Sequence, residues 1–157
     1  GGVYGMEAMN VLRLEKGFVT HAEIDGRATA YDVGMQKMVS EKKDFIGNKM
    51  AQRPGLLDPN RERLVGLKTN GAHSSVTAGS HLFNIDDEPL ADNNQGYISS
   101  AAFSPIENCY IGLAFLKRGP ERWGEKIKAV NFVADTELNC EICPPVFYDP
   151  GGKKIRA

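Results

Sequence analysis

One acidic residue near the start of the chain has a position suited to binding chemistry. Glu15 ends a Leu-Arg-Leu-Glu run and lies three residues past Leu12 and four past Val11. In a helix these spacings align the carboxylate with apolar side chains, and burying an unpaired carboxylate is costly. One interpretation is a carboxylate aimed into a pocket, where a guanidinium or the edge of an aminopyrimidinone ring would offer two parallel N–H donors. The alternative is a helix-end glutamate that reaches solvent or pairs with Lys16, Arg13 or a neighbour.

The other residues that commonly carry chemistry are not grouped in a recognisable way. The sequence has a lone C-x-x-C at Cys140–Cys143, and neither Cys109 nor a histidine lies at a zinc-ligand spacing from it. If that segment is a strand, its two cysteines point to opposite faces. His21, His73 and His81 are scattered, with no serine or cysteine nucleophile in a recognisable elbow. We therefore predict no catalytic residue and no metal site in this chain, and no nucleotide-phosphate loop motif occurs.

The first third of the chain has a helical pattern. Met, Ala, Leu, Glu and Arg fill residues 5–17, where Gly17 is a typical helix stop. Thr29 and Asp32 have the spacing of a capping box. The remaining expectations are an extended segment at 18–24, a turn at 25–26, a strand at Met35–Val39, a polar stretch at 40–44, a short helix at 47–53 ended by Pro54-Gly55, and a linker at 56–62.

From residue 63 onward the pattern becomes all-β. Short runs rich in Val, Ile, Leu, Phe and Tyr alternate with Gly, Asn, Asp and Pro breaks, which is typical of a small antiparallel barrel or jelly roll. The candidate strands are Arg63–Thr69, Ser80–Asn84, Gly96–Phe103, Tyr110–Lys117, Glu125–Val130, Thr136–Ile142 and Val146–Tyr148.

Length and composition exclude several functional classes. The chain has 157 residues, enough for one domain or for one domain with a smaller attached piece. With 19 basic and 20 acidic residues, it lacks the basic surface that nucleic acid requires. No apolar run is long enough for a membrane span, and we expect no signal peptide. Three cysteines, an odd number, favour a reducing, cytoplasmic location.

The chain resembles a known family in several motifs, which occur in the family's order. In the first part these are LRLEKG at 12–17, DVGM at 32–35 and KDFIG at 43–47. They resemble the folate-binding aminomethyltransferase (glycine-cleavage T-protein) family. The whole run at 5–18 is closer still to the carboxy-terminal part of the alpha subunit of heterotetrameric sarcosine oxidase. At Thr29-Ala30 the sequence departs from the Thr-Pro that is usual in the family.

The second part of the chain carries the same resemblance. The family's barrel hairpin is similar to GYISSAAFSP at 96–105 followed by YIGLAFLK at 110–117. The sarcosine-oxidase version is similar to RWGE at 122–125 and VFYDPGG at 146–152. The resemblance therefore spans nearly the whole chain.

The resemblance implies roles for a few residues. In the family the LRLE glutamate holds the pterin ring of tetrahydrofolate, and this role carries over to Glu15. Lys42 and Lys43 lie where the family has basic residues near the polyglutamate tail of folate, although a charge run is also typical of a solvated surface. His21 is a candidate for the rim of the pocket. The flavin and nicotinamide cofactors of sarcosine oxidase lie elsewhere, so we expect neither flavin nor NAD on this segment.

We therefore expect an α+β chain in two parts. Residues 1–59 would be the carboxy-terminal, incomplete part of a folate-binding core domain, and residues 60–157 a self-contained antiparallel barrel. The Gly1-Gly2 start without Met suggests a fragment that lacks the family's catalytic aspartate and is inactive alone. Its partners would be the rest of the alpha chain, other sarcosine oxidase subunits and folate.

By this resemblance, the parent protein would transfer the one-carbon unit of oxidised sarcosine to tetrahydrofolate. Two alternatives stay open. One is another aminomethyltransferase-like enzyme, of the glycine-cleavage or dimethylglycine dehydrogenase type. The other is a non-catalytic barrel for subunit assembly, which would lack folate affinity and expose apolar patches on its helix side.

Overall fold

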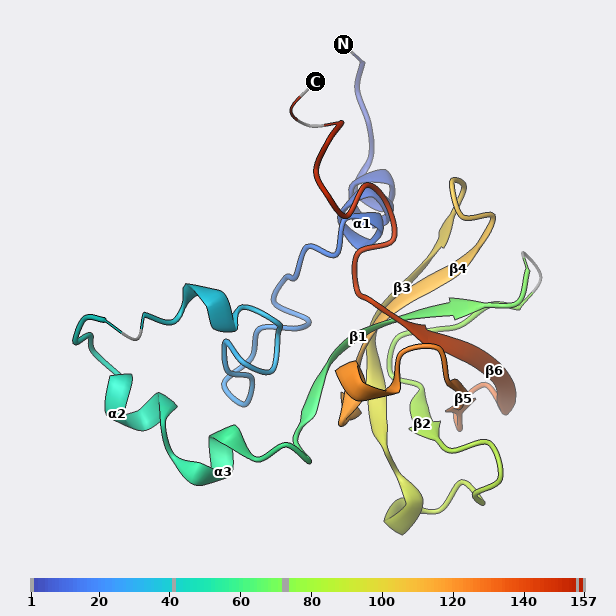
Figure 1. Cartoon of the computed structure of the whole chain (residues 1–157). Coiled ribbons are helices and arrows are strands. Elements are labelled where there is room, and N and C mark those ends of the chain that lie inside the picture. Colours follow the sequence, from blue (N-terminus) through green and yellow to red (C-terminus); the bar gives the residue numbers. More distant parts are fainter. Residues whose placement is uncertain (1, 41, 72–73, 155, 157) are drawn as a thin grey trace.

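A closed barrel of six antiparallel strands forms most of the molecule, in the order β1-β4-β3-β2-β5-β6 (Figure 1). The computed structural model describes residues 2–40, 42–71, 74–154 and 156. The strands are β1 (Glu62–Thr69), β2 (His81–Phe83), β3 (Gly96–Ser104), β4 (Cys109–Lys117), β5 (Lys126–Asn131) and β6 (Thr136–Cys143). The predicted barrel is therefore confirmed, and six of the seven candidate strands lie within one residue of their predicted bounds.

The strands separate two apolar cores because their side chains alternate between the two faces of the sheet. In β1, Val65 and Leu67 are fully buried in the barrel interior, together with residues from every other strand. Leu64 of the same strand belongs to a second core on the outside of the barrel, with Leu113 and Phe115 of β4. Closure pairs β1 with both β4 and β6, so the barrel has no free strand edge.

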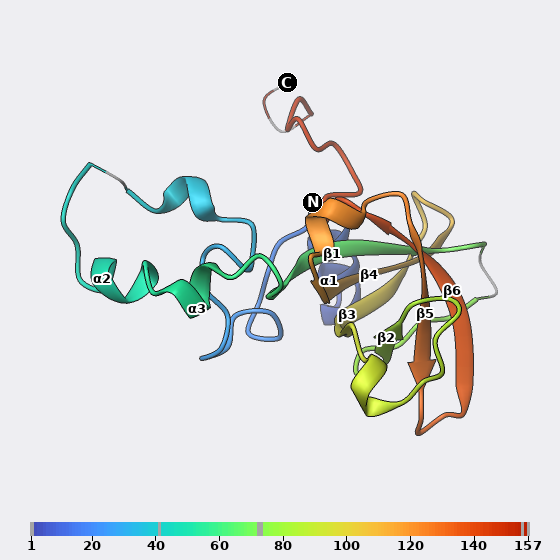
Figure 2. The ribbon, with the colours of Figure 1, turned by 60° about the horizontal axis from the view of Figure 1, so that its bottom comes forward.

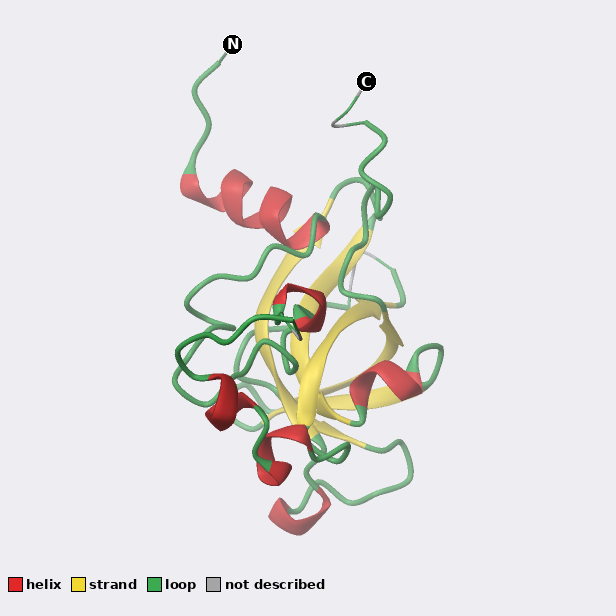
Figure 3. Cartoon of the chain, turned by 60° about the vertical axis from the view of Figure 1, so that its left-hand side comes forward, coloured by secondary structure: helices red, strands yellow, loops and turns green. Residues whose placement is uncertain are grey.

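The helix α1 (Met6–Glu15) covers the outer core near the ends of β3 and β4 (Figure 3). Its anchor is Leu14, which is completely buried in the outer core. In contrast, Leu12, which belongs to the expected apolar stripe, is 58% exposed. The helix therefore binds the barrel through its last turn, and much of its apolar stripe faces outward.

The end of α1 confirms the predicted glycine stop and shows why a glycine is needed there. The N–H of Gly17 donates to the carbonyl of Leu14 (2.9 Å) and the N–H of Phe18 donates to that of Arg13 (2.8 Å). This pair of bonds is a Schellman motif, which requires a left-handed residue, and Gly17 has φ +69°. The absent Cβ also leaves room for the carbonyl of Pro145.

Two predicted strands are wrong, because their N–H groups bind elsewhere. Residues 146–148 run along α1 after β6, and the N–H groups of Phe147 (3.0 Å) and Tyr148 (2.8 Å) donate to the carbonyl of Glu15. Residues 35–39 contain the 3-10 turn η1 (Gln36–Met38), which is closed by local bonds. No barrel edge is free to pair with either segment.

The remaining short elements lie around these parts. The expected helix at 47–53 is α2 (Asn48–Ala51). Pro54 does not end a helix as predicted but begins α3 (Pro54–Leu57), since proline suits the first helical position. In both views the segment with α2 and α3 lies to one side of the barrel (Figure 2). Two more 3-10 turns are η2 (Ala91–Asn93) and η3 (Gly119–Arg122). No described helix has the length and apolar character needed to cross a bilayer.

Replacing Gly17 with alanine is expected to lower the free energy of unfolding by ~2 kcal/mol or more, because a Cβ there combines left-handed strain with a clash against Pro145. Gly34→Ala is the matched control, since Gly34 has φ +76° but no atom near its missing Cβ. It should cost ~1 kcal/mol. Urea unfolding measures both variants, and equal losses would contradict the proposed contact with Pro145.

Candidate functional site

A groove of about 550 Å³ lies beside α1, and Glu15 forms part of its lining. One wall is α1 with the residues that follow it, and the other is the carboxy-terminal segment after β6 together with the β3–β4 turn. Most of the lining side chains are apolar or aromatic. They are Tyr4, Met9, Leu12, Phe18, Ile106 and Tyr148, and the polar lining residues besides Glu15 are Arg13, Lys16, Asp149 and Lys154.

Glu15 is buried without a charged partner. Glu15 is only 3% exposed, and the hydroxyl of Ser104 on β3 donates to its Oε1 at 2.6 Å. That hydroxyl in turn accepts from the N–H of Glu107 at 3.1 Å. None of the described residues donates to Oε2, and none places a cation within 4 Å of the carboxylate. Of the partners in the alternative interpretation, Arg13 and Lys16 are therefore wrong, and the neighbour that bonds Glu15 is the hydroxyl of Ser104.

The other two buried acids of the described chain behave differently, because each is paired with an arginine. Glu23 lies 3.1 Å from Nη1 of Arg13. Asp32 lies 2.6 Å from Nη2 of Arg61, which also donates to it through Nε. A buried carboxylate normally has such a partner, so Glu15 is the exception in this fold.

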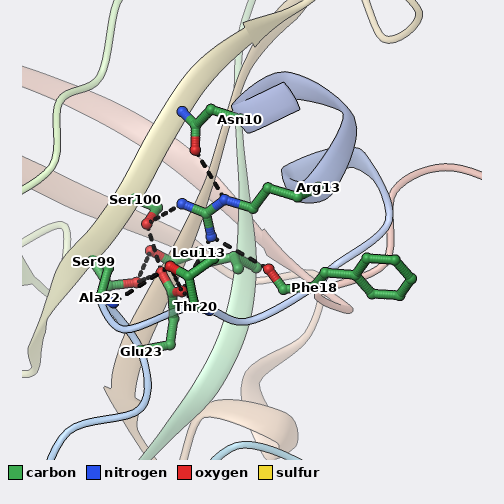
Figure 4. Close-up of polar contacts among 9 residues, drawn as sticks. All are labelled: Asn10, Arg13, Phe18, Thr20, Ala22, Glu23, Ser99, Ser100 and Leu113. Atoms are coloured by element: carbon green, nitrogen blue, oxygen red, sulfur yellow. Dashed lines mark hydrogen bonds and ion pairs between the residues drawn. The ribbon is translucent and has the colours of Figure 1, made fainter. Parts of the chain in front are cut away.

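Arg13 ties α1 to the barrel (Figure 4). Besides Glu23, its guanidinium donates to Asn10 (2.9 Å) and to the hydroxyl of Ser100 on β3 (2.6 Å). Glu23 accepts further bonds from two adjacent serines of β3, Ser99 and Ser100. Sequence reasoning did not find Glu23 or the two serines, because the serines lie 76 to 87 positions from Glu23 and Arg13 and no local pattern marks the pair of Arg13 and Glu23.

This network lowers the pKa of Glu23. Burial alone would raise it, but the hydrogen bonds from Ser100, Thr20 and Ser99 and the charge of Arg13 together outweigh burial. Its role is structural: the ionised carboxylate holds Arg13, and through it α1, against β3.

The predicted capping box at Thr29 is confirmed. The N–H of Thr29 donates to Oδ2 of Asp32 (2.9 Å), and the N–H of Asp32 donates back to the Thr29 hydroxyl (3.3 Å). Arg61, the residue before β1, then bonds Asp32. This contact fixes residues 29–32 against the barrel.

The structure does not bring the other predicted folate residues to the groove of Glu15. His21 is exposed and is not among the groove's lining residues. Lys42 and Lys43 are exposed, and Lys42 lines a different hollow with Tyr31 and Gln36. His73 lies outside the described residues.

The cysteines have the environments of structural thiols. Cys140 lies in the interior core, whereas Cys143 is half-buried and lies outside it. Burial raises the pKa of each thiol to about 12, so both are protonated and unreactive near neutral pH. Within the described residues, no group of three metal-ligating side chains comes together.

Acid is expected to weaken the attachment of α1 through Glu23. Because the folded pKa lies below the ordinary value of 4.5, the unfolded chain binds the proton first as pH falls. The stabilisation by Glu23 is therefore complete above about pH 4.5 and is lost below it. Glu23→Gln should flatten the pH dependence of the free energy of unfolding between about pH 5 and 3.

Glu121→Gln is the control for this series, since Glu121 forms only an exposed pair with Arg118. Urea unfolding across pH should show a wild-type slope for that variant. An unchanged slope in Glu23→Gln would contradict the role given to the network.

The comparisons with known proteins agree with this architecture. The family model of the glycine cleavage T-protein C-terminal barrel domain matches residues 62–149. A solved structure, the glycine cleavage system aminomethyltransferase T from Bartonella henselae, superposes with a TM-score of 0.75 over 91% of this chain and 38% of that chain. At 21% identity, this likeness shows the fold.

Curated relatives match nearly the whole chain. The sarcosine oxidase subunit alpha of Rhizobium meliloti is 39% identical over 153 residues, which cover 97% of this chain and 16% of the relative. The corresponding subunit of Corynebacterium sp. (strain U-96) is 31% identical over 156 residues, again 16% of its length. An aminomethyltransferase of Francisella tularensis is 30% identical over 157 residues, 39% of its length. The chain thus spans a minor part of these relatives, and it belongs to the glycine cleavage T-protein family, whose C-terminal barrel domain it contains.

Proposed function

We propose that this chain is the carboxy-terminal part of a sarcosine oxidase alpha-like subunit, and that its Glu15 groove binds the pterin end of tetrahydrofolate. The parent protein would transfer the one-carbon unit of oxidised sarcosine to the folate. Residues 1–59 would belong to the folate-binding domain and residues 60–157 to the barrel that supports it. The higher identity to sarcosine oxidase alpha subunits than to aminomethyltransferases favours this parent.

One observation carries the proposal: Glu15 is a buried carboxylate, and none of the described residues places a cation within 4 Å of it. The fold supplies an arginine to Glu23 and to Asp32, but only a hydroxyl to Glu15. Such a charge costs free energy in the absence of a partner. A ligand with a pair of N–H donors would remove this cost on binding.

The groove has the composition that a flat heteroaromatic ligand requires. Its apolar and aromatic walls would cover the faces of a pterin ring, and the Glu15 carboxylate would accept from the amide and amino N–H groups at the ring's edge. Two parallel N–H···O bonds to a carboxylate fix the orientation as well as the affinity. The protein would therefore position the folate amines where they can capture a methylene group.

The backbone keeps this carboxylate in a fixed place. The Glu15 carbonyl accepts from two N–H groups of the carboxy-terminal segment, and Ser104 orients one side-chain oxygen. Lys42, Lys43 and His21 have a secondary place in the proposal. Lys42 and Lys43 would contact the polyglutamate tail beyond the groove, and His21 would contribute at most to its rim.

Assembly is a second candidate function, and a specific observation favours it. The outward face of α1 and its surroundings exposes large apolar side chains. Such a patch is typical of protein interfaces, and sarcosine oxidase subunits are by name parts of a larger enzyme. The exposed residues are Val3, Tyr4, Met6, Met9, Leu12 and Phe18.

Folate titration separates these functions. Glu15→Ala is expected to weaken tetrahydrofolate binding by about 2 kcal/mol, or ~30-fold, because the pterin donors would lose their acceptor. Calorimetry with reduced folate measures the dissociation constant for each variant. Glu7→Ala, an exposed acid on the same helix, is the matched control and should bind like the wild type.

Two results would contradict the pterin site. One is an affinity that Glu15→Ala leaves unchanged. The other is the absence of saturable binding to a wild-type chain whose thermal unfolding is cooperative, which would favour the assembly function.

A further inference from the structure

We propose that a second pocket, between the outer face of the barrel and residues 25–32, binds a small zwitterion that carries both an ammonium group and a carboxylate. The ligand class is that of small amino acids and their N-alkyl derivatives. The pocket is separate from the Glu15 groove, and the two share no lining residue. The inference therefore does not depend on the folate proposal.

Strand register assembles the barrel side of this pocket. Glu62 of β1 lies opposite Lys117 of β4, and Phe115 of β4 lies opposite Tyr97 of β3. All four side chains line the same cavity of about 350 Å³. Its volume is within the range of small-molecule sites, which often form at the junction of two structural units.

Residues 25–32 close the pocket from the other side. Asp25, Arg27 and Asp32 contribute to its lining, as does Arg61. These four charges already neutralise one another: Arg27 pairs with Asp25 (2.6 Å), and Arg61 pairs with Asp32 (2.6 Å). The charges that remain in the lining are the carboxylate of Glu62 and the ammonium of Lys117.

Glu62 has no partner among the described residues. No described side chain or backbone N–H donates to its carboxylate, and Lys117 does not come within ion-pair distance of it although the two residues are cross-strand neighbours. Partial burial raises the pKa of Glu62 despite the nearby positive charges. A half-buried acceptor facing a cavity is the expected complement of an ammonium group.

On the positive side of the pocket, Lys117 and Arg27 have N–H groups that make no hydrogen bond with the described residues. The Lys117 ammonium donates one bond to the carbonyl of Asn94 (2.8 Å), which leaves two of its three hydrogens. Arg27 uses Nε and Nη2 on Asp25, which leaves the hydrogens of Nη1. A ligand carboxylate would accept from these groups.

The aromatic floor suits the carbon atoms between the two charges. The rings of Tyr97 and Phe115 stack with centroids 5.7 Å apart and an interplanar angle of 26°. The faces of such rings attract methyl and methylene groups next to a positive nitrogen. Tyr97 and Phe115 both line the cavity, so their rings are available to a ligand.

Charge balance favours a zwitterion over a simple ion. A ligand with only a carboxylate would leave Glu62 unpaired and would be repelled by its negative charge. A ligand with only an ammonium group would leave Lys117 unpaired and would be repelled by its positive charge. A molecule with both groups satisfies the two residual charges at once. Its optimal length is short, because Glu62 and Lys117 are cross-strand neighbours.

Ligand titration tests this assignment with sarcosine as the probe. Calorimetry, together with amide chemical shifts from NMR, should show saturable binding of sarcosine, with shifts centred on Ala28, Glu62 and Tyr97. Acetate and dimethylammonium, which each carry one of the two charges, should bind at least 10-fold more weakly. Tetrahydrofolate should not compete, because it would occupy the other groove.

Two variants and two controls complete the test. Glu62→Gln and Lys117→Met should each weaken sarcosine binding at least 10-fold. The controls Glu125→Gln and Lys126→Met alter exposed charges outside the pocket and should bind like the wild type. A variant is used only if its amide NMR spectrum shows that the barrel is still folded. If Glu62→Gln or Lys117→Met fails this check, Tyr97→Leu is measured in its place.

Three outcomes would overturn the proposal. They are no saturable binding of sarcosine to the wild type at up to ~100 mM, equal affinity in Glu62→Gln, and acetate binding as tight as sarcosine, which would indicate an anion site only. Each can be observed whether or not the Glu15 groove binds folate.

Discussion

The last turn of α1 is fixed to the barrel, and the rest of the candidate site depends on this attachment. Leu14 inserts into the outer core, and Arg13 bonds Glu23 and Ser100. The carbonyl of Glu15 receives two N–H groups from the carboxy-terminal segment. An isolated helix of this length is not stable in water, so these contacts hold it in place.

The same attachment explains how a carboxylate without a charged partner can stay buried. Glu15 lies between two anchored neighbours: Leu14 is buried in the outer core, and the Lys16 ammonium donates to the carbonyl of Asp149 (2.6 Å) and pairs with its carboxylate (3.2 Å). The free energy cost of the unpaired charge is offset by the packing and hydrogen bonds around it. Local costs of this kind are typical of binding sites, where a ligand supplies the missing partner.

Local patterns in the sequence predicted most of the fold. The six strands were found because alternating side chains and turn residues act over short distances, and the Gly17 stop and the Thr29 capping box have local signals as well. The strand predicted at 146–148 failed because its N–H groups bind a helix carbonyl more than 130 positions away. Apolar content alone could not reveal that partner.

The candidate sites were less accessible to sequence reasoning. Glu15 was identified from its place on a helix face, but the contrast with Glu23 and Asp32 required knowledge of which acids have arginine partners. The second pocket required the strand register, since Glu62, Tyr97 and Lys117 come from three strands. Their chemistry exists only in the folded barrel.

The unfolding free energy of Glu15→Gln, compared with that of Glu23→Gln at neutral pH, tests most directly whether Glu15 is a binding carboxylate. The amide keeps the shape and the Ser104 contact but removes the charge. A residue that awaits a ligand should tolerate the change, so Glu15→Gln should be as stable as the wild type or more stable, whereas Glu23→Gln should lose ~2 kcal/mol or more. A loss in Glu15→Gln as large as that in Glu23→Gln would show that Glu15 serves the fold, and would contradict its assignment to a ligand.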